Sequence, residues 1–229
     1  MTILLKIWIA LFFSMLATVA YAENSRTWTP LGGDTGPAHS AGRKLASSPA
    51  GDFALVDISS TISTDFKFLG VATASNGKIV FAPSNADGVG VFDPTDNSFA
   101  LVDISSTIST DWKFHGAATA SNGKIIFAPL NADGVGVFDP TDNSFALVDI
   151  SSTISTYEKF QGAATASNGK IIFAPRNADS VGVFDPTDSS FALVDISSTI
   201  STDSKFSGAA TASNGKIIFA PYNADGVGV

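Results

Sequence analysis

The chain has 229 residues, of which 45% are hydrophobic and 15% charged, and it contains 20 Gly and 18 Phe. This composition excludes an intrinsically disordered protein and favours a packed, turn-rich domain. The formal net charge of −8 comes from Asp residues spread along the chain, without a cluster of Lys or Arg. Because such a cluster is needed to neutralise phosphates, we expect no nucleic-acid partner and no anionic membrane partner. The sequence contains no Cys, so packing rather than disulfides must stabilise the fold.

The first 22 residues have the pattern of a secretory signal peptide. Lys6 precedes an almost wholly apolar run over residues 7–20, and Ala20-Tyr21-Ala22 places small residues where signal peptidase cleaves. The alternative is an uncleaved anchor, for which this run is short, since a bilayer span takes roughly 20 residues. We therefore expect a secreted or cell-surface protein, or a periplasmic one if the source is bacterial. Residues 23–51, rich in Pro, Gly and Ser, are typical of a flexible leader or linker.

Residues 52–229 are built from tandem repeats. The segment Phe-Ala-Leu-Val-Asp-Ile-Ser-Ser-Thr-Ile-Ser-Thr begins at Phe53, Phe99, Phe145 and Phe191, which gives a period of 46 residues. Self-similarity at a period of about 20–50 residues is typical of repeat architectures, in which neighbouring repeats share one continuous core. We therefore expect a single domain.

Each repeat predicts four short strands separated by turns. A polar Ser/Thr connection at 105–110 follows the first strand of the second copy. The Ser-Asn-Gly-Lys segment at 121–124 predicts a type I′ hairpin turn, and Asp-Pro-Thr-Asp at 139–142 places Pro where a type I turn prefers it. No segment after residue 22 has a helical period. The apolar runs of this copy are residues 99–104, 116–120, 125–128 and 135–138.

Four antiparallel strands in a repeat of about 40–50 residues indicate the blade of an all-β fold, the β-propeller. Blades converge on a central axis, so the innermost strand needs small side chains. The run Gly-Ala-Ala-Thr-Ala at 116–120 meets this need. We therefore expect 116–120 to be the innermost strand and 99–104 to be the outermost.

The residues also resemble a known repeat. Asn-Gly-Lys-Ile-Ile-Phe-Ala-Pro at 122–129, followed by Val-Gly-Val-Phe-Asp-Pro at 135–140, is similar to the YVTN-type propeller repeat and, more loosely, to kelch and NHL repeats. The resemblance covers about three quarters of the chain, although Phe-Ala-Pro stands where YVTN repeats read Tyr-Val-Thr-Asn. It implies an extracellular or surface propeller, a scaffold that also carries enzymes such as lactonases. It transfers no catalytic motif to this chain.

Two arrangements of the blades fit the repeats. Residues 53–58 form an outermost strand, three complete repeats follow, and the last repeat supplies three strands up to Val229. If 53–58 completes the last blade, the ring closes with about four blades and its two exposed edges disappear. Otherwise the repeats belong to a larger propeller, or to an open ring that self-assembles.

Three positions differ in every copy. Two flank the invariant Lys-Phe before the innermost strand, and the third follows the next strand. In an up-and-down blade these connections emerge on one face, so we expect a recognition surface on rigid loops, with aromatic and Arg side chains as its main contacts. Free drift of exposed positions after duplication is the alternative. The three sets are Phe66, Trp112, Glu158 and Ser204; Leu69, His115, Gln161 and Ser207; and Ser84, Leu130, Arg176 and Tyr222.

These sets predict a module that binds a protein, peptide or glycan, without a cofactor, rather than an enzyme. The alternative is a propeller hydrolase or lyase with an axial active site. In that case His115, Glu158 and Arg176 would supply a base, an acid and an anion clamp.

A metal site is not expected. The oxygen ligands of Asp93, Asp96 and Asn97, and of Asn85 with Asp87, suit Ca²⁺. However, no copy has a calcium-loop spacing, and Asx turns explain these residues more simply. Two His and no Cys argue against zinc or copper.

Two invariant charged positions have expected structural roles. The Asp that ends each outermost run is expected to cap the following Ser/Thr connection, and the invariant Lys to pair with it. These residues are Asp57, Asp103, Asp149 and Asp195, and Lys67, Lys113, Lys159 and Lys205.

Overall fold

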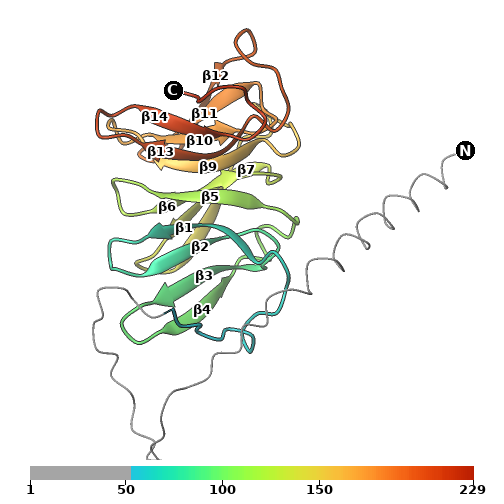
Figure 1. Ribbon diagram of the computed structural model, residues 1–229. Coiled ribbons are helices and arrows are strands. Elements are labelled where there is room, and N and C mark those ends of the chain that lie inside the picture. The colour runs from blue at the N-terminus through green and yellow to red at the C-terminus, as the bar shows by residue number, and fades with distance from the viewer. Residues whose placement is uncertain (1–52) are drawn as a thin grey trace, which may run out of the picture. The chain divides into compact units, whose positions relative to one another are not determined.

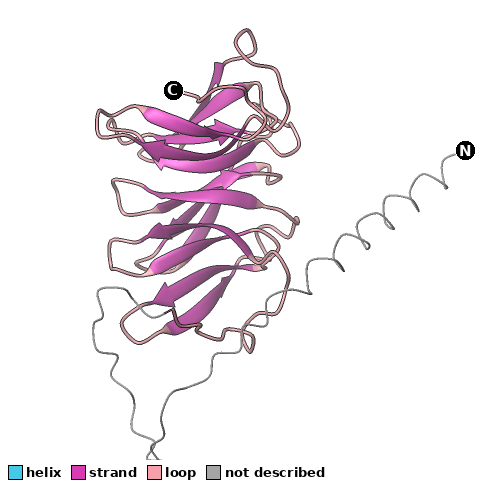
Figure 2. Cartoon of the chain, viewed as in Figure 1, coloured by secondary structure: helices cyan, strands magenta, loops and turns pink. Residues whose placement is uncertain are grey.

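The computed structural model describes residues 53–229, and the expected signal peptide (1–22) and leader (23–51) lie outside the described residues. This part of the chain consists of strands, turns and loops (Figures 1 and 2). Within it, no helix is long and apolar enough to cross a bilayer. The strands form three four-stranded antiparallel sheets and one two-stranded sheet, each with its strands in sequence order.

The four sheets are four successive blades. The first contains β1 (Phe68–Thr73), β2 (Ile79–Pro83), β3 (Gly88–Asp93) and β4 (Ser98–Asp103). The second contains β5 (Phe114–Thr119), β6 (Ile125–Pro129), β7 (Gly134–Asp139) and β8 (Ser144–Asp149). The third contains β9 (Phe160–Thr165), β10 (Ile171–Pro175), β11 (Ser180–Asp185) and β12 (Ser190–Asp195), and the fourth contains β13 (Phe206–Thr211) and β14 (Ile217–Pro221). The all-β prediction and the four-stranded blade are confirmed, with strand ends within two residues of those expected.

The strand of small residues is innermost, as predicted. The equivalent strands β1, β5, β9 and β13 pack against one another in turn. Gly116 has a φ of +116°, and a Cβ at this position would lie 2.7 Å from the Cα of Gly162 in the next blade. This contact between backbones requires glycine. A hydrogen bond adds to it, since Thr119 Oγ1 donates to the carbonyl of Thr73 over 2.7 Å, and the next two blades repeat this bond.

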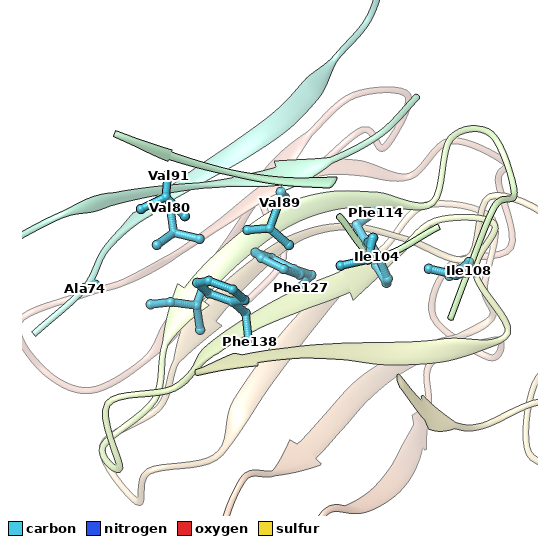
Figure 3. Close-up of a cluster of buried hydrophobic side chains, with 12 residues drawn as sticks. Ala74, Val80, Val89, Val91, Ile104, Ile108, Phe114, Phe127 and Phe138 are labelled. Atoms are coloured by element: carbon cyan, nitrogen blue, oxygen red, sulfur yellow. The ribbon is translucent and has the colours of Figure 1, made fainter. Parts of the chain in front are cut away.

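The hydrophobic cores lie between consecutive blades. Figure 3 shows the first of them, in which Val80 and Val89 of the first blade pack against Phe114, Phe127 and Phe138 of the second. A second core repeats this arrangement between the second and third blades. Each blade therefore presents an aliphatic face to its successor and an aromatic face to its predecessor, so the repeat encodes its own packing partner.

The Asn-Gly turn differs from the predicted type I′ turn. Only Gly77 has a positive φ, of 82°, and its N–H donates to the carbonyl of Ala74 over 2.9 Å. Asn76 instead accepts a hydrogen bond from the N–H of Lys78 through Oδ1 over 3.1 Å. The type I′ prediction is wrong because the asparagine side chain forms an Asx turn, which leaves the left-handed conformation to glycine alone, as in a three-residue hairpin loop.

One of the two structural roles expected for invariant charges is confirmed. Asp103 Oδ1 accepts a hydrogen bond of 2.8 Å from the N–H of Ser105, and the other three copies repeat this cap. The expected pairing of lysine with these aspartates is wrong. Lys113 is buried and its Nζ donates to the carbonyls of Ser84 and Ala86 in the preceding blade, over 3.3 and 3.1 Å. The lysine therefore joins two blades and does not pair with the capping aspartate.

The closed four-blade ring is also wrong. Residues 53–58 form no strand, and no strand pairs them with the fourth blade. Val56 and Ile58 instead lie beside the first blade, where they line a cavity of about 220 Å³ with Phe68 and Phe99 among others. The described residues form an open series of blades, each packed on its neighbours in the chain. Residues 53–58 therefore have the sequence of an outermost strand but belong to no sheet.

Candidate ligand-binding site

The first variable position has an unusual backbone conformation in every blade. Phe66, Trp112, Glu158 and Ser204 have φ values of 50°, 54°, 52° and 53°. This left-handed region is uncommon for residues other than Gly, Asn and Asp, and is strained for bulky side chains. Such strain persists only where the surrounding structure imposes it, and it concentrates at functional sites.

An invariant asparagine is hydrogen-bonded to this position in every blade. Asn85 Oδ1 accepts a hydrogen bond of 3.0 Å from the N–H of Trp112 in the next blade, while the N–H of Asn85 donates to the carbonyl of Phe66 in its own blade, over 3.2 Å. Asn131 and Asn177 make the same two bonds one and two blades further on. Each asparagine thus ties two consecutive variable loops together, which gives the variable side chains a rigid base.

The third variable position is bonded into the same network. The N–H of Leu130 donates to the carbonyl of Lys113, and its carbonyl accepts from the N–H of Lys159 in the next blade, each over 2.9 Å. The variable residues of one blade therefore lie next to those of the following blade. Backbone hydrogen bonds thus make direct neighbours of residues that lie 17 and 29 positions apart in the sequence.

Between the second and third blades this arrangement forms a pocket of about 180 Å³. Five of its six lining residues belong to the predicted variable sets. The sixth, Tyr157, was missed, although the sequence carries a signal for it: the equivalent residue is Asp in the other three copies. The lining residues are Trp112, His115, Leu130, Tyr157, Glu158 and Arg176.

The polar wall of the pocket is an ion pair. Arg176 Nε lies 3.0 Å from Glu158 Oε2, and Nη1 donates to Gln161 Oε1 over 2.6 Å. The Nε–H is nonetheless buried without an aligned hydrogen-bond acceptor, so the pair is a close charge contact rather than a two-pronged bond. Burial, followed by the nearby Arg176 charge, lowers the pKa of His115 to about 4. His115 is therefore neutral at pH 7 and can donate or accept a hydrogen bond.

An aromatic surface adjoins the pocket. The rings of Phe66 and Trp112 lie 4.9 Å apart and are tilted by 39°. Phe66 is 61% exposed and Tyr157, on the pocket wall, is 67% exposed. Exposed aromatic side chains on a rigid base offer a large contact area at a low entropic cost.

Other predicted site residues lie apart from this pocket. Ser84 is fully buried with an unpartnered Oγ, so the structure does not bring it to the surface. Leu69 is half-buried on the first blade. Ser204, Ser207 and Tyr222 belong to the fourth blade, where Tyr222 is 66% exposed.

The acidic turns are explained by hydrogen bonds within the turns themselves. Asp93 Oδ1 accepts from the N–H and the hydroxyl of Thr95, over 3.0 and 2.6 Å, and Asp96 Oδ1 accepts from the N–H of Ser98 over 2.9 Å. The Asx-turn interpretation is confirmed for Asp93 and Asp96. It is wrong for Asn85, whose Oδ1 accepts a hydrogen bond from the N–H of Trp112 in the next blade instead. Residues 53–229 contain no group of three or more His, Cys, Asp or Glu side chains that could hold a metal ion.

Comparison with known proteins identifies the fold. No protein-family model and no curated protein matches the chain. Among solved structures, virginiamycin B lyase from Staphylococcus aureus matches with a TM-score of 0.55 at 16% identity, covering 72% of this chain and 52% of the lyase. The extracellular domain of the putative hybrid two-component system BT3049 from B. thetaiotaomicron matches with a TM-score of 0.57 at 17% identity, covering 74% of this chain and 22% of that one.

These matches show the class of fold, a β-propeller, and do not single out the YVTN, kelch or NHL type. A streptogramin B lyase matches similarly, with a TM-score of 0.55 at 18% identity over 71% of this chain and 50% of the lyase. The chain spans about half the length of the lyase structures that it matches.

Proposed function

We propose that the protein is a secreted or surface-exposed binding module that recognises a protein, peptide or glycan through its variable loops. The observation that carries this proposal is the left-handed position shared by Phe66, Trp112, Glu158 and Ser204. Drift under stability selection alone would favour Gly or Asn there, since both adopt this conformation at low cost. Each copy instead has a different side chain, three of them large or charged, on a backbone held by asparagine.

The size and chemistry of the pocket suit an anchoring contact. Its volume of about 180 Å³ is below the range of about 300–1,000 Å³ that is common for small-molecule sites. It has room for one side chain or one sugar unit of a larger ligand, which would extend over the aromatic pair of Phe66 and Trp112. Aromatic residues and Arg dominate the binding energy of such interfaces.

An extracellular role agrees with the apolar N-terminal run and with the extracellular domains among the structural matches. Fractionation of cells that express the full 229-residue sequence tests it. The expected result is protein outside the cytoplasm with residues 1–22 removed, shown by mass spectrometry of the product. Retention of residues 1–22 in a cytoplasmic product would contradict this part of the proposal.

The binding test uses peptide and glycan arrays probed with the purified protein. We expect Trp112→Ala and Arg176→Ala each to weaken binding at least about tenfold, the size of a hot-spot contact. Lys124→Ala, on the opposite Asn-Gly turn, is the control and should leave binding unchanged. Equal losses in all three variants, or binding lost only with Lys124→Ala, would refute recognition by the variable face.

A hydrolase or lyase is the second candidate, because His115, Glu158 and Arg176 line one pocket, as this alternative requires. No hydrogen bond links His115 to Glu158 in the described residues, so any catalytic contact would form through the ligand. His115→Gln separates the two functions. If the protein is an enzyme, the variant should still bind the ligand found on the array but no longer convert it. If the protein is a binding module, neither the protein nor the variant should convert that ligand.

A further inference from the structure

The two charged side chains of the pocket between the second and third blades compensate each other. Glu158 lies in the loop before β9 and Arg176 in the loop after β10, with Arg176 Nε 3.0 Å from Glu158 Oε2. Arg176 Nη1 also donates to Gln161 Oε1 over 2.6 Å. A charged ligand group of either sign would be attracted by one member of the pair and repelled by the other, so it would lose its hydration without a net gain. The pair therefore favours an uncharged ligand.

The other polar atoms of this pocket match hydroxyl groups. Within residues 53–229, Glu158 Oε1 and Arg176 Nη2 take part in no hydrogen bond, which leaves an acceptor and a donor for a ligand. The neutral imidazole of His115 offers one of each, and the hydroxyl of Tyr157 does the same. A sugar hydroxyl both donates and accepts, so it can bond to each of these groups. An apolar side chain would instead leave them unpaired, at a cost in binding free energy.

Aromatic rings form a platform in the pocket and next to it. Trp112 lines the pocket, and its ring lies 4.9 Å from that of the exposed Phe66. Tyr157, on the pocket wall, is also exposed. The face of an aromatic ring is negative, and the C–H groups of a sugar ring are weakly positive, so the two surfaces attract each other. A ligand longer than one sugar unit can therefore extend from the pocket over Phe66 and Trp112.

The equivalent place between the first and second blades has a different chemistry. The residues equivalent to Glu158 and Arg176 are Trp112 and Leu130, so this junction lacks the ion pair. The rings of Phe66 and Trp112 contact each other there instead. Two adjacent places on the variable face thus offer an aromatic surface and a polar pocket, which suits two consecutive units of an extended ligand.

We propose that the ligand is an uncharged oligosaccharide, with one pyranose unit in the pocket and the next unit over Phe66 and Trp112. The hydroxyls of the first unit bond to Glu158 Oε1 and Arg176 Nη2, and its C–H face packs on the aromatic wall. Acidic sugars are disfavoured because their carboxylate would face Glu158, and peptides because an apolar side chain leaves the polar wall unpaired. This inference rests on the proposed function and narrows its three ligand classes to one.

The first test uses the purified protein and pairs of oligosaccharides that differ only at C6. Oligomers of glucose, galactose and mannose are compared with oligomers of the corresponding uronic acids in the same linkage, beside a peptide array. A neutral sugar should bind at least about tenfold more tightly than its acidic counterpart, because only the acidic one brings a charge to Glu158. Equal or tighter binding of every acidic sugar would overturn the inference. Binding of peptides alone would also overturn it and leave the proposed function intact, whereas absence of binding to every probe would overturn both.

The second test changes the charge balance of the pocket. Glu158→Gln keeps the shape of the side chain but removes the charge that compensates Arg176. Binding of the acidic sugar should therefore rise at least about tenfold relative to binding of its neutral counterpart. Asp185→Asn is the matched control, since it removes the carboxylate of another ion pair of the third blade, Lys170–Asp185 at 3.4 Å, which lies outside the pocket. An unchanged ratio in Glu158→Gln, or equal changes in both variants, would overturn selection by the ion pair.

The third test addresses the aromatic wall. Tyr157→Asp introduces the residue that the other three copies have at this position, so the blade accommodates it and the melting temperature should not change. Binding of the neutral sugar should fall about tenfold, the size of a hot-spot contact. Tyr157→Phe keeps the ring and should retain most of the binding. Unchanged binding in Tyr157→Asp would overturn the placement of the sugar in this pocket, and equal losses in the two variants would overturn its packing on the ring.

Discussion

Asn131 Oδ1 accepts a hydrogen bond of 3.0 Å from the backbone N–H of Glu158, 27 residues later and in the next blade. Asn131 itself is bonded through its N–H to the carbonyl of Trp112, over 3.1 Å. One side chain thus connects the two variable loops that form the pocket. Because both loops depend on it, the pocket and the packing of consecutive blades are linked, and substitutions at this asparagine should affect ligand binding as well as stability.

Asn131→Ala should therefore lower the free energy of unfolding by about 1 kcal/mol, the usual net contribution of such a hydrogen bond. It should also weaken ligand binding, because the loop of Glu158 loses its bond to the preceding blade. Urea titration and binding to an array hit measure the two effects. Asn131→Asp keeps the acceptor oxygen and should restore most of both. A loss of binding in Asn131→Asp equal to that in Asn131→Ala would contradict the role of the acceptor.

Ser204→Gly should stabilise the protein. Relief of left-handed strain contributes about 1–2 kcal/mol, and the greater freedom of glycine in the unfolded chain removes about 0.5–1 kcal/mol of that gain. A net increase of about 0.5–1 kcal/mol in the free energy of unfolding should appear in denaturant titrations. Ser207→Gly, on β13 without a positive φ, is the control and should be destabilising. If both substitutions destabilise equally, the conformation at Ser204 carries no strain.

Gly116→Ala should be severely destabilising. The added Cβ would lie 2.7 Å from a backbone carbon of the next blade, at a φ of +116°. Strain and overpacking together should cost about 3 kcal/mol or more. Gly123→Ala also has a positive φ, but the nearest atom would be Ser75 Oγ at 3.5 Å, so only the conformational cost of about 1 kcal/mol applies. Equal losses for the two variants in urea titrations would mean that the inner strands can separate without penalty.

Protonation of His115 should destabilise the fold as the pH falls. Its pKa is lowered from 6.5 in the unfolded chain to about 4 in the folded protein, first by burial and then by Arg176. Between these values the unfolded chain binds a proton that the folded protein does not, so stability is full above pH 6.5, falls towards pH 4 and is constant below.

The measurement is the difference in melting temperature between the protein and its His115→Gln variant across this range. The melting temperature of the variant should fall less as the pH decreases, because the variant lacks the proton that His115 takes up on unfolding. The bond from the backbone N–H of Ser105, followed by that from its hydroxyl, lowers the pKa of Asp103 below 3.8, so such capped aspartates also contribute to the pH dependence of stability at low pH. Both proteins contain the same aspartates, so this contribution cancels in the difference. If the melting temperatures of the protein and the variant change equally between pH 7 and pH 4, His115 is not buried and neutral in the folded protein.

Several features of the site were accessible from sequence because repeats make small differences visible. Positions that differ in every copy, such as those of Trp112, His115 and Arg176, pointed to the loops that form the pocket. Tyr157 was overlooked because only one copy departs from Asp there. The burial of Ser84 and Leu130 was not predictable, since it depends on how closely the next blade approaches.

The sequence by itself determined the blade: strand order, the innermost run of small residues and the outermost run that starts with Phe99. These follow from side-chain size and from hydrogen bonding within about 46 residues, so local chemistry specifies them. Only the tertiary structure decided what residues 53–58 do, which partner Lys113 takes and why glycine is needed at Gly116. Each of these depends on contact between surfaces of different blades. Identical repeats offer several equivalent partners for one segment, and only the packing of neighbouring blades in space selects among them.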